Sequence, residues 1–125
     1  MIEVLIPLNN EYRKYDSQIK ALYEQEQNKI GDSNSYEFVR DNTLFYAFLL
    51  NKTLIGAIYY FFDDDKLFLN GFARPKNHYN NLYCLKLSTS WFVCPIYAEA
   101  QNRASALCLL RCGFKRVSGN LFLKK

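Results

Sequence analysis

The strongest structural signal in this chain of 125 residues is a short helical block near its C-terminus. Asn102 opens the block, a small residue follows at Ser105, and Gly113-Phe114 closes it. An Asn at this place can cap a helix by accepting a backbone N–H of the first turn. Glycine takes the left-handed conformation that often ends a helix. The block therefore predicts a helix with marked ends and one apolar face against the core.

The length suits one domain, residues 1–125, and is too short for two. Hydrophobic residues make up 50% of the chain and aromatic residues 17%, so a packed core is expected and disorder is not. The longest apolar run, around residues 57–62, falls far short of the roughly 20 residues that span a bilayer. Polar residues interrupt the N-terminus, so we expect no signal peptide and a cytoplasmic protein.

No metal site is expected. The four cysteines, Cys84, Cys94, Cys108 and Cys112, contain no C-x-x-C pair, and the chain has one histidine. Without an export signal, reduced thiols are the expected state. Residues 63–65 are three adjacent aspartates, but the glycine and distal glutamate of a calcium loop are missing. We interpret this run as a solvated turn.

The net charge of +4 is concentrated in a basic C-terminal third. A basic patch can hold the phosphates of a nucleotide-like cofactor or contact nucleic acid. The chain has no run of five like charges and no RNA-binding aromatic motif, so nucleic acid is not the expected partner.

Hydrophobic spacing divides the chain into alternating strands and helices. Steps of three and four predict helices at 11–30, 36–41, 81–91 and within 102–113. Runs rich in aromatic and β-branched residues predict strands at 2–6, 44–50, 53–62, 66–73, 95–100, 114–117 and 121–123. Asn51-Lys52 should join two strands as a hairpin, and residues 76–81 should form a polar loop.

The resulting order is β-α-α-β-β-β-α-β-α-β-β. It predicts an α+β single domain, with a mixed central sheet of about seven strands flanked by about four helices.

The block from Asn102 to Phe114 resembles the last motif of the GNAT superfamily of acyl-CoA-dependent N-acyltransferases, N-x-x-A/S-x-x-L-Y-x-K-x-G-F. Leu109 stands where that motif has Tyr. The run Leu54-Ile55-Gly56-Ala57 is similar to the family's third strand, and the element order matches the GNAT fold over most of the chain. The chain is identified as a divergent, compact member, and its Asn-, Lys- and Tyr-rich composition would suit a phage or mobile-element source.

The resemblance implies acetyl-CoA as the cofactor. In the family, the diphosphate lies on an R/Q-x-x-G-x-G/A turn at a helix N-terminus. The matching stretch here, residues 74–82, contains no glycine. The resemblance also implies that the cofactor arm enters between splayed fourth and fifth strands, along residues 71–73. Asn102 would contact the arm, although a role as helix cap alone stays open. The residues implied for cofactor binding are Phe72, Ala73, Arg74, Lys76, Asn80, Asn81, Asn102 and Ser105.

Acyl transfer to an amine needs a base for the amine proton, and an acid can protonate the leaving thiolate. Leu109 cannot donate a proton, and two phenols nearby are candidate acids: Tyr97 on the fifth strand and Tyr79 in the loop. Glu99, at the end of the fifth strand, is the candidate base, and His78 titrates near neutrality beside the expected cofactor entrance. For each of these candidates, an ordinary surface role stays open.

The function implied is transfer of an acetyl group from acetyl-CoA to an amine of a small molecule or protein. The alternative is a GNAT-fold protein that has lost catalysis and serves as a binding or structural module, such as a phage or mobile-element accessory protein. An unrelated α+β domain is the third possibility. The aromatic hairpin at 45–62 could also support a homodimer or larger assembly.

Overall fold

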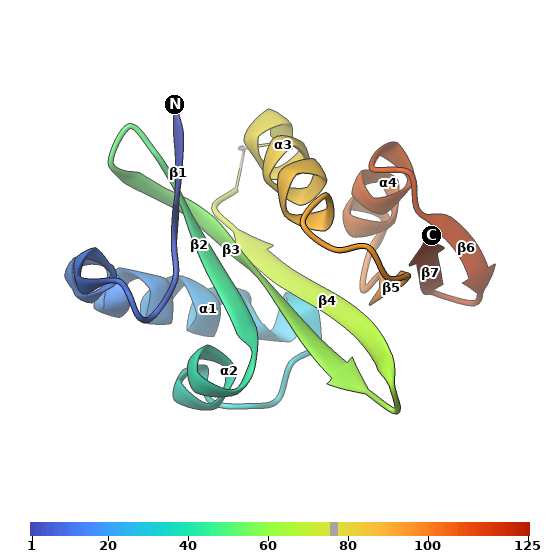
Figure 1. Ribbon diagram of the computed structural model, residues 1–125, viewed down its shortest axis with the longest axis horizontal. Helices are drawn as coiled ribbons and strands as arrows, with labels where there is room; N and C mark the ends of the chain where they lie inside the picture. Colours follow the sequence, from blue (N-terminus) through green and yellow to red (C-terminus); the bar gives the residue numbers. More distant parts are fainter. Residues whose placement is uncertain (76–77) are drawn as a thin grey trace.

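The computed structural model, which describes residues 1–75 and 78–125, is organised around one seven-stranded sheet in the order β1-β2-β3-β4-β5-β7-β6 (Figure 1). The element order and the mixed sheet confirm the α+β prediction. The strands are β1 Ile2–Leu5, β2 Leu44–Leu50, β3 Thr53–Asp63, β4 Lys66–Ala73, β5 Ile96–Glu99, β6 Lys115–Ser118 and β7 Leu121–Lys124. The helices are α1 Asp16–Ile30, α2 Tyr36–Asn42, α3 His78–Thr89 and α4 Arg103–Arg111, preceded by a 3-10 turn, η1, at Asn10–Lys14.

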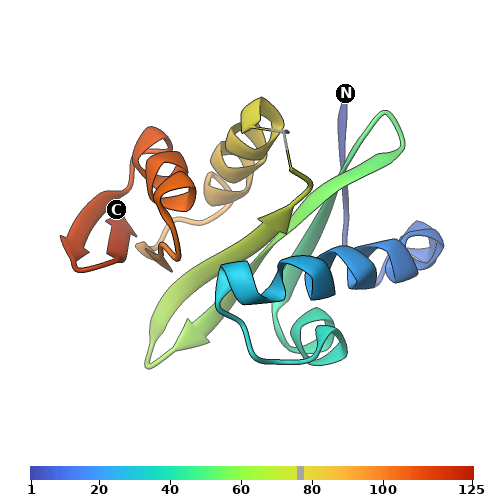
Figure 2. The same ribbon diagram turned by 180° about the vertical axis from the view of Figure 1, so that it is seen from behind.

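Helices cover both faces of the sheet: α1 and α2 lie on one face, α3 and α4 on the other (Figures 1 and 2). The hairpin of β2 and β3 therefore buries side chains on both of its faces. Phe45 and Tyr59 stack at 5.8 Å beneath α1 and α2. Tyr60 belongs to the core beneath α3 and α4. This two-sided burial explains why these strands are aromatic throughout rather than alternating with polar residues.

Two tight turns order the central strands. In the β2–β3 turn Asn51 and Lys52 have φ of 49° and 68°, and in the β3–β4 turn Asp64 and Asp65 have φ of 51° and 64°. Positive φ at both central residues is the type I′ geometry, which matches the twist of paired strands. The predicted hairpin is confirmed, and the aspartate run is a turn.

The block from Asn102 to Phe114 forms α4 with both predicted ends. Asn102 Oδ1 accepts the Ser105 N–H at 2.9 Å, and Ser105 Oγ accepts the Asn102 N–H at 3.3 Å, which is a capping box. Gly113 follows the helix with φ of 100°, in the region that favours glycine. Phe114 is then buried in the core.

Two predicted boundaries are wrong. The helix expected at 11–30 is split into η1 and α1, with Tyr15 at the junction. The polar stretch expected as a loop at 76–81 enters α3 at His78, so Asn80 and Asn81 lie in a helical turn. Asparagine is tolerated there because the first turn has backbone N–H groups without intrahelical partners. Lys76 and Asn77 are outside the described residues.

The sheet contains one parallel pair. β4 and β5 pair only at Leu67↔Ile96, Phe68↔Tyr97 and Leu69↔Ala98, and then diverge (Figure 1). β5 continues the sheet through β7, which it pairs in antiparallel fashion. Within residues 1–75 and 78–125, no helix has the length and apolarity needed to cross a bilayer.

Candidate active site

A pocket of about 770 Å³ lies where β4 and β5 separate. Its walls come from the end of α1, the free part of β4, the first turns of α3, the end of β5 and the length of α4. Leu82, Leu85 and Leu109 make its α3–α4 side apolar. The pocket therefore reaches both faces of the sheet, with an apolar side and a side that carries charged groups.

One edge of β4 is open in this pocket. Its antiparallel ladder with β3 continues to Ala73, but on the other edge the described residues show no strand partner beyond Leu69. Backbone N–H and C=O groups at such an edge require partners from side chains, water or a ligand. The edge from Asn70 to Ala73 is therefore a place where an extended ligand can pair as an added strand.

The floor of the pocket depends on two glycines. A Cβ at Gly56 would lie 2.6 Å from the Phe72 carbonyl oxygen, and a Cβ at Gly71 would lie 2.9 Å from the Ala57 carbonyl oxygen. Both contacts are with backbone, which cannot move aside as a flexible side chain can. Glycine at these positions lets β3 and β4 approach closely below the open edge.

The α4 wall combines a polar start with an apolar middle. Asn102 and Ser105, which form the capping box, line the pocket, and Leu109 is buried in its wall. Cys84 and Cys108 also line it. Burial raises the pKa of the Cys84 thiol to about 12 and also raises the pKa of Cys108. Both thiols thus stay protonated near neutral pH, which does not suit a nucleophile.

One end of the pocket lies by the start of α3. Asn81 and Leu82 line it, and no acidic residue occupies the first turn of this helix. The positive end of a helix dipole favours an anion there. Arg74 also lines the pocket, where its Nε donates to the Leu54 carbonyl oxygen at 2.7 Å. This end of the pocket is therefore suited to negative charge.

Two carboxylates line the pocket, Glu99 and Glu26. Glu99 is exposed at the end of β5, as predicted. Glu26 was missed by the sequence reasoning: its side chain is only 10% exposed, and Lys29 Nζ lies 3.5 Å from it. The signal was present, because Glu26 falls at helical spacing on the apolar face of α1, after Leu22 and Tyr23.

A smaller hollow of about 240 Å³ adjoins the pocket on the α1 side. The two share five lining residues, Ile30, Leu69, Asn70, Glu99 and Gln101. Asp32 and Asp63 join Glu99 in the smaller hollow, and no Lys or Arg is among its described lining residues. No metal-binding group of three or more His, Cys, Asp or Glu is found in the described part of the chain.

The structure brings most of the predicted site residues together. Those that line the pocket are Phe72, Ala73, Arg74, Asn81, Glu99, Asn102 and Ser105. Tyr97 is not among them: its ring packs 5.5 Å from Phe68 and lies under Lys66 Nζ at 5.4 Å. Asn80 is half-buried in α3 and does not line the pocket either. The predictions for Lys76 and for the side chains of His78 and Tyr79 fall outside the described part of the molecule.

No protein-family model and no curated protein sequence matches the chain. Solved structures do match it along nearly its whole length. A probable acetyltransferase from Staphylococcus epidermidis has a TM-score of 0.66 at 12% identity, covering 99% of this chain and 98% of that one.

Two further matches were solved in complex with coenzyme A. The Bacillus subtilis N-acetyltransferase YlbP has a TM-score of 0.57 at 16% identity, covering 99% of this chain and 96% of that one. The PaiA N-acetyltransferase from Thermoplasma acidophilum has a TM-score of 0.56 at 17% identity, covering 98% and 96%. At these identities the likeness is one of fold. With its diverging parallel strands and capped last helix, the chain has the GNAT fold.

Proposed function

We propose that this protein is an N-acetyltransferase that uses acetyl-CoA and acts on an amine. The observation that carries the proposal is the open edge of β4 inside a pocket at the separation of β4 and β5. Two proteins of the same fold that have coenzyme A in their structures, YlbP and PaiA, support the choice of cofactor.

The residues present suit this cofactor. The volume of about 770 Å³ and the apolar α3–α4 wall fit a pantetheine arm, whose amides can pair with the β4 edge at Asn70–Ala73. The start of α3 and Arg74 would hold the diphosphate, in place of the glycine turn that residues 74–82 lack. Asn102 and Ser105 would border the arm from α4.

Acetyl-CoA, when bound, supplies an activated thioester carbonyl. The amine would approach from the smaller hollow, which meets the pocket at Glu99. Glu99 would take the proton of the attacking amine, and the carboxylates of Asp32 and Asp63 favour an acceptor that is a cation in solution. Leu109 contributes an apolar wall that excludes water and no proton. Because all four cysteines are free thiols, we place this activity in a reducing compartment, the cytoplasm.

The absence of a proton donor at Leu109 favours a second candidate, a GNAT-fold protein that binds acyl-CoA without transferring the acyl group. Both candidates bind the cofactor, and only the first releases the CoA thiol when an amine is added.

The first experiment is a titration of the protein with CoA and acetyl-CoA, followed by calorimetry and by thermal melting. A ligand at 100 times its Kd adds about 2.7 kcal/mol to the stability and should raise the Tm by several degrees. The absence of heat and of a Tm shift at millimolar ligand would rule out both candidates. If the protein binds acetyl-CoA, we test release of the CoA thiol with spermidine, a lysine peptide and an aminoglycoside as amines. Binding without release with all three would support the second candidate, a protein that binds acyl-CoA without transferring the acyl group.

Glu99→Gln tests the proposed base. We expect kcat to fall about 10²- to 10⁴-fold, because general-base catalysis contributes that much, while the Kd for CoA stays unchanged. Glu24→Gln is the matched control, since Glu24 is an exposed residue of α1 outside the pocket. If Glu26→Gln abolishes turnover and Glu99→Gln does not, the base is Glu26.

A further inference from the structure

Asn70 is at the point where the pocket and the smaller hollow meet, and it lines both. Its side-chain amide makes two hydrogen bonds to backbone. Nδ2 donates to the Ile30 carbonyl oxygen, at the last residue of α1, at 3.0 Å. Oδ1 accepts the Gly71 N–H at 2.8 Å. One half-buried side chain thus joins the end of a helix to the edge of a strand.

The first bond has an ordinary structural purpose. The last carbonyls of a helix have no intrahelical partner, and Asn70 satisfies the final one of α1. The second bond is different, because Gly71 lies just past Leu69, where the pairing of β4 with β5 stops. Its N–H therefore belongs to the open edge, and a side-chain amide oxygen takes the position that a strand carbonyl would occupy.

The atom that fills this position is chemically similar to the expected ligand. The Asn70 Oδ1 is an amide carbonyl oxygen, and a pantetheine arm presents amide and thioester carbonyl oxygens. A hydrogen bond from Gly71 N–H can go to one such acceptor with good geometry at a time. The Asn70 side chain and a cofactor carbonyl therefore compete for one backbone donor.

We propose that the Asn70 side chain competes with the cofactor at the open edge of β4. Its Oδ1 accepts the Gly71 N–H, and this hydrogen bond, which we call the latch, must break when a cofactor carbonyl pairs there. This inference rests on the proposed function. It identifies a residue that lowers the affinity for acyl-CoA. Displacing a neutral intramolecular hydrogen bond costs a factor of about 2 to 10 in affinity.

Two substitutions separate the effect of the latch from that of the other hydrogen bond, in which Asn70 Nδ2 donates to the Ile30 carbonyl oxygen. Asn70→Ala removes both bonds, and Asn70→Asp keeps an acceptor for Gly71 N–H but loses the donor to Ile30. Both variants lack the donor to the Ile30 carbonyl oxygen. They differ in the latch, which Asp strengthens because a carboxylate makes the stronger hydrogen bond.

The readout is the Kd for CoA and for pantetheine, measured by calorimetry. Pantetheine lacks the diphosphate, so repulsion between that group and a new negative charge at position 70 does not contribute to its affinity. We expect Asn70→Ala to bind both ligands about 2- to 10-fold more tightly and Asn70→Asp to bind them more weakly. Weaker binding by both variants, or unchanged binding by both, would overturn the latch.

A matched control is Asn42→Ala. Asn42 Nδ2 donates to the Phe38 carbonyl oxygen at 2.9 Å, so this change removes a similar side chain–backbone bond away from the pocket. Its ligand affinities should equal those of the wild type. If Asn42→Ala lowers the Kd by as large a factor as Asn70→Ala does, the latch is also overturned.

Amide hydrogen exchange at Gly71, measured by NMR without ligand, tests the contact itself. Exchange should be faster in Asn70→Ala than in the wild type, because the N–H loses its acceptor. Equal rates would overturn the latch whatever the ligands do. The exchange rates can differ while the wild type binds neither CoA nor pantetheine. In that case the Asn70–Gly71 hydrogen bond is confirmed, but the proposed function is wrong and the bond does not compete with a cofactor.

Discussion

Among single residues, Asn102 has two roles: it caps a helix, and we propose that it contacts the cofactor. Its Oδ1 caps α4 by accepting the Ser105 N–H at 2.9 Å, and it lines the pocket. The cap uses the oxygen of the amide and leaves the Nδ2 group for another partner. The two roles are therefore compatible, and substitutions that change only one half of the amide can separate them.

Asn102→Ala should lower the free energy of unfolding by about 0.5–2 kcal/mol, as loss of an N-cap does. Asn102→Asp keeps the capping oxygen and should retain the stability, since a carboxylate also suits a helix N-terminus. If Nδ2 contacts the cofactor, Asn102→Asp will weaken CoA binding with an unchanged Tm. Urea unfolding and calorimetry measure the two quantities. Wild-type stability in Asn102→Ala would contradict the capping role.

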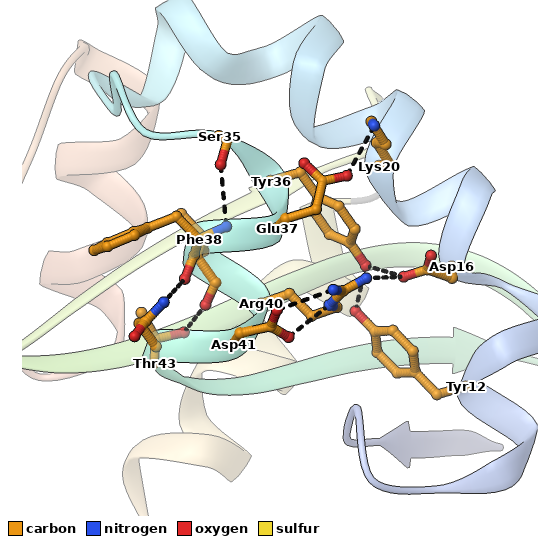
Figure 3. A network of polar contacts seen from close by, with 12 residues as sticks. Tyr12, Asp16, Lys20, Ser35, Tyr36, Glu37, Phe38, Arg40, Asp41 and Thr43 are labelled. Carbon is orange, nitrogen blue, oxygen red and sulfur yellow. Dashed lines mark hydrogen bonds and ion pairs between the residues drawn. The ribbon is translucent and has the colours of Figure 1, made fainter.

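At the scale of elements, a polar network joins η1, α1 and α2 beside the core (Figure 3). The Tyr12 and Tyr36 hydroxyls are 2.6 Å apart, and Tyr36 donates to Asp16 Oδ1 at 2.7 Å. Arg40 pairs with Asp16 at 3.3 Å and lies over the Tyr36 ring. Both tyrosine rings are almost fully buried, so their hydroxyls depend on each other and on Asp16. This network sets how α2 packs against the start of α1.

Tyr36→Phe should destabilise the protein by about 1–3 kcal/mol, because it leaves the buried Tyr12 hydroxyl without this partner. The double variant Tyr12→Phe/Tyr36→Phe should cost less than the sum of the single changes, since no unpaired hydroxyl remains. Chemical denaturation of the four proteins of this cycle measures the coupling. Tyr83→Phe, at an exposed site on α3, is the control and should stay within about 0.5 kcal/mol of the wild type. Additive single effects would contradict the coupling.

At the scale of the whole molecule, the core contains buried phenols on both faces of the sheet. Tyr12, Tyr36 and Tyr59 lie beneath α1 and α2, and Tyr60 lies beneath α3 and α4. Burial raises the pKa of each of these four hydroxyls above its ordinary value. The folded state therefore holds these protons more tightly than the unfolded chain does.

The sign of the pH dependence follows from these raised pKa values. Below about pH 10, tyrosine is protonated in both states and its stabilising contribution is complete. Above that pH the unfolded chain loses protons first, so the free energy of unfolding falls as pH rises. We expect Tm to begin to fall above about pH 9, where the thiols of Cys84 and Cys108 ionise first in the unfolded chain, and to fall more steeply from pH 10 to 11, where the tyrosines add their effect. Tyr12→Phe/Tyr36→Phe should lose less over that interval. A Tm that is flat to pH 11 would contradict this account.

The features that could be predicted from the sequence are those that depend on residues close together in the chain. Among them are the element order, the turns predicted at 51–52 and 63–65 and both ends of α4. The position of Phe72, Arg74 and Glu99 in the pocket came from the family resemblance combined with that order.

Which side chains share the pocket depends on how distant segments of the chain pack together. Tyr97 and Glu99 are two apart on β5, yet Glu99 borders the pocket while Tyr97 packs on Phe68. Glu26 reaches the pocket from α1, and Asn70 meets both Ile30 and Gly71. These positions depend on where the pairing of β4 with β5 stops and on how α1 crosses the sheet. Both result from packing between segments far apart in the chain, which periodicity along the sequence does not encode.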